Sequence, residues 1–307
     1  MKRIAVLMST YNGEKYLQEQ IDSIINQKCD CDIQLIIRDD GSSDNTIEIL
    51  KRNAEKGNLI YFTGANLGAG YGFLQLLIDN PDYDYYAFAD QDDYWYADKL
   101  QRAVDVISSI ENYALYCSNS EMCDASLVPL GRNVHRTMKY YNHERVFLGL
   151  TCAQGCTCVF NKRLAKLIQE KEMPQNTILH DSFITCLCFA VGGFFYADEW
   201  SSMKYRMHGN NVGGLLTKAQ TGFMKMIISR MHYIFSIPKH SIVSQMAEIE
   251  KTYGEKIPSK NLELLQSVVV SKYILSKRLR YLLSSTIKDE SFNLDVANRI
   301  KILLGNY

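Results

Sequence analysis

Apolar, β-rich runs alternate with amphipathic stretches over the first 90 residues of the chain. The strand-like runs are RIAVLMST at 3–10, IQLIIRDD at 33–40, LIYF at 59–62 and YYAFA at 85–89. Apolar residues at helical spacing fill 14–27 and 45–56, and a further helix is expected near 72–79. This alternation builds a parallel sheet with crossover helices, so the sequence predicts an α/β fold.

Three of the predicted strands run directly into polar residues, at Ser9-Thr10, Asp39-Asp40 and Asp90-Gln91-Asp92. Parallel sheets bind ligands at the carboxyl ends of their strands. Carboxylates as close together as Asp90, Asp92 and Asp93 repel one another unless a cation lies among them. A single cluster of this kind fits a solvated turn equally well, but three clusters at one edge favour a functional site.

The glycine-rich GAGYG at 68–72 is predicted to be a tight loop that lets the backbone approach a ligand. It follows the third strand and lacks the full G-x-G-x-x-G spacing, so it is not interpreted as a dinucleotide fingerprint.

Composition excludes several classes of protein. With 34 basic and 34 acidic residues and no basic stripe, a nucleic-acid partner is not expected. Nine scattered cysteines without a secretory signal favour reduced thiols and a cytoplasmic location. The longest apolar run, 183–197, has 15 residues and includes Gly192-Gly193, which predicts a buried helix running into a strand.

Three motifs, STYNG at 9–13, RDDGSSDNT at 38–46 and ADQDD at 89–93, together resemble the family 2 glycosyltransferases with the GT-A fold. The resemblance implies a mostly parallel central sheet flanked by helices, in a catalytic domain over 1–215. Its nucleotide-sugar half would cover about 1–110 and its acceptor half about 111–215, followed by a helical C-terminal region at 216–307.

The same resemblance implies a set of donor contacts. One carboxylate of Asp39-Asp40 would face the base or ribose, and which one is left open. Asp92, the second carboxylate of the D-x-D motif, would coordinate a divalent ion on the donor diphosphate. The residues implied to contact the nucleotide sugar are Thr10, Tyr11, Asn12, Asp39, Asp40, Asn66, Gly68, Asp90 and Gln91.

Two downstream motifs are similar to those of rhamnosyltransferase-like members. ILHDSF at 178–183 resembles the acceptor-side motif whose acidic residue is the catalytic base, here Asp181. YRMHGNNVGG at 205–214 implies His208 as a further metal ligand. Acceptor contacts are expected from His180, from Trp95 and from the turn AQGCTC at 153–158, through Gly155 and Cys156.

The residues alone leave alternatives for several of these positions. Asp181 could simply cap its helix, and His208 could be an ordinary loop histidine. His180 could orient Asp181, contact the acceptor or only pack. Trp95 could stack on a sugar or anchor the core.

The implied chemistry is an inverting transfer from a nucleotide sugar. Mg²⁺ or Mn²⁺ would neutralise the leaving diphosphate, and an imidazole ligand favours Mn²⁺. One base is then needed at the acceptor hydroxyl, opposite the leaving group. The expected donor is dTDP-L-rhamnose ahead of a UDP-hexose, and the acceptor is a glycan or lipid-linked glycan in cell-surface polysaccharide synthesis.

Three rival functions remain from the sequence. A sugar nucleotidyltransferase would need a glycine- and arginine-rich loop where STYNG stands, and a phosphatase would carry D-x-D after its first strand. A non-catalytic nucleotide-sugar-binding scaffold would keep the fold without the transfer.

Beyond residue 215 the sequence predicts helices at 218–240, 241–254, 260–285 and 293–305. The first is rich in methionine, phenylalanine and basic residues, so peripheral contact with the inner face of the membrane is one expectation. Packing on the catalytic domain, or on a second copy in a homodimer, is the other.

Overall fold

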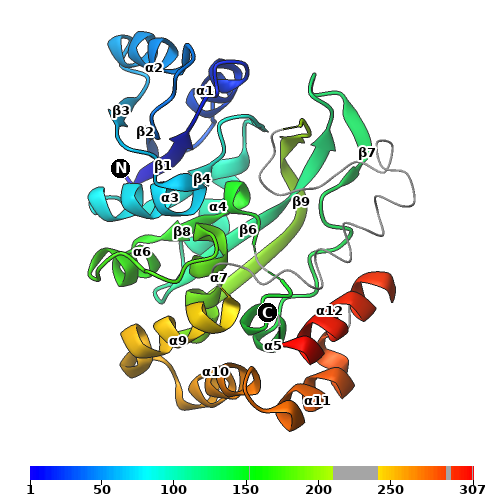
Figure 1. Ribbon diagram of the computed structural model, residues 1–307. Coiled ribbons are helices and arrows are strands. Elements are labelled where there is room, and N and C mark those ends of the chain that lie inside the picture. The colour runs from blue at the N-terminus through cyan, green and yellow to red at the C-terminus, as the bar shows by residue number, and fades with distance from the viewer. Residues whose placement is uncertain (152, 210–240, 288–291, 306) are drawn as a thin grey trace.

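The computed structural model describes residues 1–151, 153–209, 241–287, 292–305 and 307. Its centre is one mixed β-sheet with helices on both faces, and further helices from the end of the chain gather at one end of the molecule (Figure 1). The predicted α/β class with a C-terminal helical region is confirmed.

The described strands form one nine-stranded sheet in which the first four strands that the chain forms lie together. The order is β3 (Ile60–Thr63), β2 (Asp32–Asp39), β1 (Arg3–Thr10), β4 (Tyr85–Ala89), β8 (Val159–Asn161), β6 (Ala114–Cys123), β9 (Phe194–Arg206) and β5 (Tyr94–Trp95), with β7 (Pro129–Asn133) paired to β6. Strands β3, β2, β1 and β4 are parallel, as predicted. Later pairs are mixed, because β8 runs antiparallel to both of its neighbours while β6 and β9 run parallel.

The first three helices lie close to their predicted ranges and are α1 (Leu17–Ile25), α2 (Thr46–Glu55) and α3 (Gly68–Asp79). The chain continues with α4 (Lys99–Ile107), α5 (His143–Phe147), α6 (Lys162–Gln169) and α7 (His180–Ala190). The loop predicted at 68–72 is wrong, because these residues are the first turns of α3. A side-chain carbon on Gly72 would lie 2.6 Å from Ser9 Oγ, so this glycine lets the helix lie against β1.

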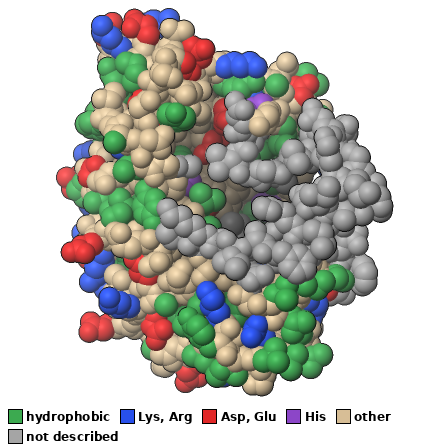
Figure 2. Space-filling model, in the orientation of Figure 1, with side chains coloured by type: hydrophobic (Ala, Val, Ile, Leu, Met, Phe, Trp, Pro, Cys, Tyr) green, Lys and Arg blue, Asp and Glu red, His purple; other side chains and the backbone are tan. Residues whose placement is uncertain are grey.

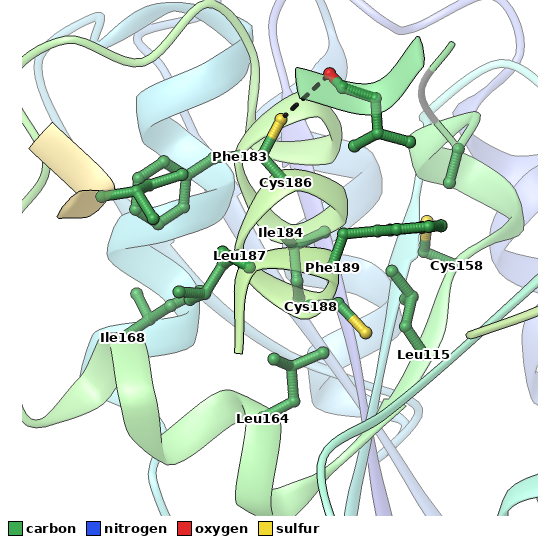
Figure 3. Close-up of a cluster of buried hydrophobic side chains, with 14 of the residues drawn as sticks. Leu115, Cys158, Leu164, Ile168, Phe183, Ile184, Cys186, Leu187, Cys188 and Phe189 are labelled. Carbon is green, nitrogen blue, oxygen red and sulfur yellow. Dashed lines mark hydrogen bonds between the residues drawn. The ribbon is translucent and has the colours of Figure 1, made fainter. Parts of the chain in front are cut away.

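The core lies on both faces of the sheet, because successive strand side chains point to opposite sides. Tyr86 and Phe88 of β4 belong to one buried cluster, and Tyr85 and Ala87 belong to the other. Helix α7 is buried nearly all round, which explains its uninterrupted apolar sequence. Figure 3 shows its side chains between α6 and β6, with the thiol of Cys186 donating to the Val146 carbonyl of α5 at 3.7 Å.

The described C-terminal residues form α9 (Ile242–Tyr253), α10 (Ser259–Ser271), α11 (Leu275–Leu283) and α12 (Phe292–Leu304). The single helix predicted over 260–285 is therefore two helices. Side chains such as Ile242, Met246 and Leu265 share the core of α7. The helix expected at 218–240 lies outside the described residues.

No helix among the described residues combines the length and apolarity that crossing a bilayer would need.

Gly193 joins α7 to β9, and a side-chain carbon there would lie 2.8 Å from Cys188 Sγ and 3.1 Å from the Cys188 carbonyl oxygen. We expect Gly193→Ala to lower the free energy of unfolding by about 1–3 kcal/mol, because the backbone cannot yield to the added methyl group. Urea denaturation measures the change. Gly254→Ala, at a site with no atom within 4 Å, is the matched control and should change stability by less than about 1 kcal/mol. If Gly193→Ala left the free energy of unfolding unchanged, α7 and β9 would have to be able to move apart.

Candidate active site

The loops that follow β1, β2 and β4 meet at one edge of the sheet. Thr10 and Asp39 are register partners at the ends of β1 and β2, and the Thr10 hydroxyl donates to Asp39 at 3.0 Å. The side-chain amide of Gln91 forms two hydrogen bonds with the backbone of Tyr11, at 3.0 and 3.1 Å. The three polar clusters found in the sequence therefore line one site. In Figure 2, acidic and histidine side chains gather in the hollowed centre of the face shown.

Asp39 and Asp40 are buried and hold backbone in place. Asp39 accepts the N–H groups of Gly41 and Ser42 at 2.9 and 2.8 Å. Asp40 pairs with Arg38 and accepts the N–H groups of Leu67 and Gly68, each at 3.1 Å. Through these bonds Asp39 shapes the loop after β2, and Asp40 ties that loop to the start of α3.

Two further residues expected at the nucleotide also shape their loops. Asn12 has a positive φ of 48°, and its side-chain oxygen accepts the Ser43 N–H at 2.8 Å. Asn66 accepts the Gly68 N–H at 2.9 Å. The side chain of Tyr11, in contrast, is 51% exposed, which leaves its ring open to a flat ligand.

At the D-x-D motif, Asp92 meets a residue from far along the chain. His208 Nε2 lies 2.8 Å from Asp92 Oδ2, and the Tyr16 ring lies 5.1 Å from the imidazole. Neighbouring ligands of one octahedral ion lie about 3 Å apart, given metal–ligand distances near 2.1 Å. The Asp92–His208 pair therefore fits a divalent cation.

Arg206 fixes this arrangement, although no role was predicted for it. Its backbone N–H donates to Asp93 at 3.0 Å, and its Nε donates to the Asp92 carbonyl at 2.6 Å. A third contact joins its guanidinium to Glu19 on α1 at 2.5 Å. Because Arg206 ends β9, it brings His208, two residues later, to the acidic loop.

A buried acidic group lies behind this pair. Ligand atoms of Asp90, Asp93 and Cys156 all lie within 4.8 Å of one another. Burial, and then repulsion from Asp92 and Asp181, raises the pKa of Asp90 to about 7. Burial and the charges of Asp92 and Asp90 raise the pKa of Asp93 well above its usual range. Such a group attracts cationic charge.

Lys99, fully buried at the start of α4, supplies part of that charge. It donates to the Cys156 carbonyl at 2.7 Å and lies 4.3 Å from the centre of the Trp95 ring. Burial lowers the pKa of Lys99 to about 8, and Cys156 and Asp93 partly oppose the shift. Sequence reasoning missed this residue, because Lys at the start of an amphipathic helix usually faces solvent.

Asp181 lies in the first turn of α7. The N-cap residue is Leu179, so Asp181 does not occupy the capping position that was its alternative. Its carboxylate accepts the Gly155 N–H at 3.3 Å and the Ser182 N–H at 2.6 Å. Gly155 precedes Cys156, whose thiol lies within 4.8 Å of ligand atoms of Asp90 and Asp93, so Asp181 lies near the acidic loop that contains the D-x-D motif.

His180 packs behind Asp181. Its ring stacks on Phe73 with centroids 4.0 Å apart and meets the edge of Phe88 at 4.8 Å. Neither ring nitrogen has a hydrogen-bond partner among the described residues, and burial lowers its pKa, so the ring is neutral at pH 7. A side-chain carbon on Gly155 would lie 2.5 Å from its Nε2, so only glycine fits there.

The acceptor contacts expected of Trp95 and Cys156 are wrong for this structure. Trp95 and Cys156 are each 1% exposed, and both belong to the core under the sheet. Gly155 and His180 are also buried, and they form the wall that supports Asp181. Gly155 and Cys156 are buried because the turn at 155–157 packs against β4 rather than facing solvent.

The C-terminal helix α9 holds the segment that leads to Asp181. Buried Gln245 donates to the Ser182 hydroxyl and accepts the Ile178 N–H, each at 3.1 Å. One turn later, Glu248 accepts the N–H groups of Gln175 and Asn176, both at 2.7 Å. Helix α9 therefore belongs to the support of the site.

Comparisons with known proteins agree with this architecture. A family model described as "Glycosyl transferase family 2" matches residues 5–168. The dTDP-rhamnosyl transferase RfbG of Shigella flexneri is 35% identical over 224 residues, covering 67% of this chain and 73% of that protein. An uncharacterized glycosyltransferase of Haemophilus influenzae is 32% identical over 127 residues, covering 40% of this chain and 49% of that protein.

Solved structures share the fold at low sequence identity. S. aureus TarS 1–349, in complex with UDP-GlcNAc, has a TM-score of 0.56 and 16% identity, covering 99% of this chain and 90% of that chain. The mannosyltransferase PcManGT from Pyrobaculum calidifontis, in complex with GDP-Man and Mn²⁺, has a TM-score of 0.51 and 14% identity, covering 98% and 85%.

Motifs, sheet topology and the family match agree: this chain belongs to the family 2 glycosyltransferases.

Proposed function

We propose that this glycosyltransferase is metal-dependent and inverting. It transfers a sugar from a nucleotide-sugar donor to a hydroxyl group of a glycan or lipid-linked glycan, in cell-surface polysaccharide synthesis. The observation that carries the proposal is that His208 lies 2.8 Å from Asp92, beside Asp90, Asp93 and Cys156, while Gly155 donates to Asp181. The proposed cation-binding residues and a candidate base are therefore close together.

Asp92 and His208 are the proposed protein ligands of the ion. A divalent cation bound there, with Mn²⁺ favoured over Mg²⁺ by the imidazole, would neutralise charge on the departing diphosphate. Arg206 keeps Asp92 and His208 together through the backbone of the acidic loop. Asp90, which is partly accessible, lies beside them as a further donor contact.

The proposed donor pocket lies over the loops after β1 and β2. Tyr11 offers its exposed ring to the base, and Thr10, Asn12, Asp39, Asp40, Asn66 and Gly68 set the backbone around it. Gln91 keeps the Tyr11 loop against the D-x-D motif. For Asp39 and Asp40 we propose indirect roles, because each carboxylate oxygen already has a partner.

Asp181 is the proposed general base. The Gly155 N–H orients its carboxylate, and α9 holds the preceding segment. In this role Asp181 accepts the proton of the acceptor hydroxyl while that oxygen attacks the anomeric carbon from the face opposite the diphosphate. The C–O bond to the diphosphate breaks as the new glycosidic bond forms, which inverts the configuration.

The proposed donor is dTDP-L-rhamnose, ahead of a UDP-hexose. Support comes from the similarity to RfbG, a dTDP-rhamnosyl transferase, which extends over 224 residues. A cytoplasmic reaction, with acceptors presented at the inner face of the membrane, completes the proposal. A scaffold that binds nucleotide sugars without transferring them is the alternative, and the first experiment below separates the two.

The first test is release of nucleoside diphosphate from a panel of nucleotide sugars, with and without Mn²⁺. We expect Mn²⁺-dependent release from dTDP-L-rhamnose in the presence of an acceptor extract. Asp181→Asn should lower the rate about 100-fold or more, because an amide cannot take the proton. Asp92→Asn should lower the rate by a similar factor, because the ion loses a ligand.

Asp105→Asn, on the exposed face of α4, is the matched control and should keep full activity. Full activity of Asp181→Asn would show that Asp181 is not the general base. Metal-dependent nucleotide binding, with no transfer from any donor, would favour the non-catalytic scaffold.

His208→Ala should raise the Mn²⁺ concentration needed for half-maximal activity at least about tenfold, because one ligand is lost. Activity should recover in part at saturating Mn²⁺, since Asp92 remains. Titration of Mn²⁺ into the protein with bound dTDP gives the affinity directly. An unchanged Mn²⁺ dependence would remove His208 from the metal site.

Gln245→Met keeps the side-chain volume but removes the hydrogen bonds to Ile178 and Ser182, on either side of Asp181. We expect kcat to fall about tenfold or more while the donor KM changes little, because the base loses its alignment. Gln266→Met, which loses an exposed bond to Glu250 on the neighbouring helix, is the control. A drop in thermal stability without a change in kcat would show that Gln245 serves the fold alone.

A further inference from the structure

Helix α11 has an apolar face that remains exposed among the described residues. Among its nine residues only Tyr281 is buried. Leu275, Leu279 and Leu283 are 53%, 44% and 89% exposed, and their i, i+4, i+8 spacing places them on one side of the helix. Tyr273 and Ile274, just before the helix, are exposed as well, at 76% and 41%. Contiguous apolar surface of this kind marks an interaction site in a soluble domain.

The neighbouring helix α12 repeats the pattern. Val296, Ile300, Leu303 and Leu304 follow i, i+4, i+7, i+8 spacing and are 36–43% exposed. Arg278 of α11 donates to the Leu303 carbonyl at 2.7 Å, which joins the two helices. Figure 1 shows them side by side at the end of the molecule away from α2 and β3.

Basic residues accompany the apolar face. Residues 264–287 contain Lys272, Lys277, Arg278 and Arg280 and no Asp or Glu, although the whole chain has no net charge. At 100° per residue, Arg278 and Arg280 flank the Leu275–Leu279–Leu283 stripe on its two sides. Figure 2 shows basic and hydrophobic side chains together on the lower part of the face, over α10 and α11.

We propose that α11 and α12 form a docking face for an anionic lipid surface. The leucine stripe would enter the boundary between headgroups and acyl chains, and the flanking arginine side chains would pair with lipid phosphates. A second copy of this chain fits less well, because a two-fold contact would set the basic residues of one copy against those of the other. This inference does not depend on the proposed function, since it concerns residues outside the catalytic pocket.

The test is co-sedimentation of the full chain with vesicles of phosphatidylcholine, with and without phosphatidylglycerol. We expect pelleting with the phosphatidylglycerol vesicles, weakening as salt is added, and little pelleting with phosphatidylcholine alone. Because each basic side chain contributes about fivefold to such partitioning, Arg280→Glu, at the edge of the leucine stripe, should reduce it at least about fivefold. Lys51→Glu with Lys56→Glu, two exposed lysines at α2, should leave it unchanged.

Leu279→Ser with Leu283→Ser should also abolish pelleting, whereas Ile60→Ser with Phe62→Ser, which are 46% and 52% exposed on β3, should not. All four positions are on the surface, and circular dichroism checks that each variant is folded. Equal pelleting with and without phosphatidylglycerol would overturn the proposal. Pelleting that is unchanged in both the charge variant and the leucine variant would overturn it as well. The proposal would also fail if the chain did not pellet with vesicles but formed a dimer in solution that the leucine variant dissociates. The face would then bind a second copy.

Discussion

Six carboxylates, three of them buried, converge near one edge of the sheet, and the compensation of their charge is the constraint on which the site depends. A buried carboxylate is costly unless hydrogen bonds or a cation compensate its charge. Asp39 and Asp40 are compensated by backbone N–H groups and by Arg38. Asp90 and Asp93 are compensated less, because burial and repulsion from neighbouring carboxylates raise the pKa of both, although Lys99 and the N–H of Arg206 oppose the shifts. The first pair builds the loops, and the second pair carries charge that is only partly compensated.

Distant segments complete the site because the long strand β9 ends beside the acidic loop. It pairs with β6 along its length and with β5 beside the D-x-D motif, and Arg206 at its end binds both the acidic loop and Glu19 of α1. The other contribution comes from α9, which reaches back to the segment before Asp181. The C-terminal helices therefore contribute at two places: α9 holds the segment before Asp181, and α11 with α12 presents an apolar, basic surface.

The sequence predicted most of the first 90 residues correctly because local signals there agree with the fold. Strands β1 and β4 have the predicted limits or lie within a residue of them, since each is an apolar run ended by polar residues. The prediction failed at 68–72, where glycines that usually indicate a loop serve the close packing of α3 on β1. It also joined α10 and α11, because the apolar periodicity continues through Lys272 while the chain turns.

Local patterns in the chain were enough to establish the fold class, the ranges of the first strands and the polar clusters at their ends, because side-chain periodicity and strand-end positions are local properties. The tertiary structure was needed to establish which side chains remain accessible. Trp95, Cys156 and His180 follow or flank motifs in sequence yet are buried, whereas Tyr11 stays exposed. It also revealed Lys99 and Arg206, whose charges are buried against partners dozens of residues away. Burial depends on long-range packing, which no local pattern encodes.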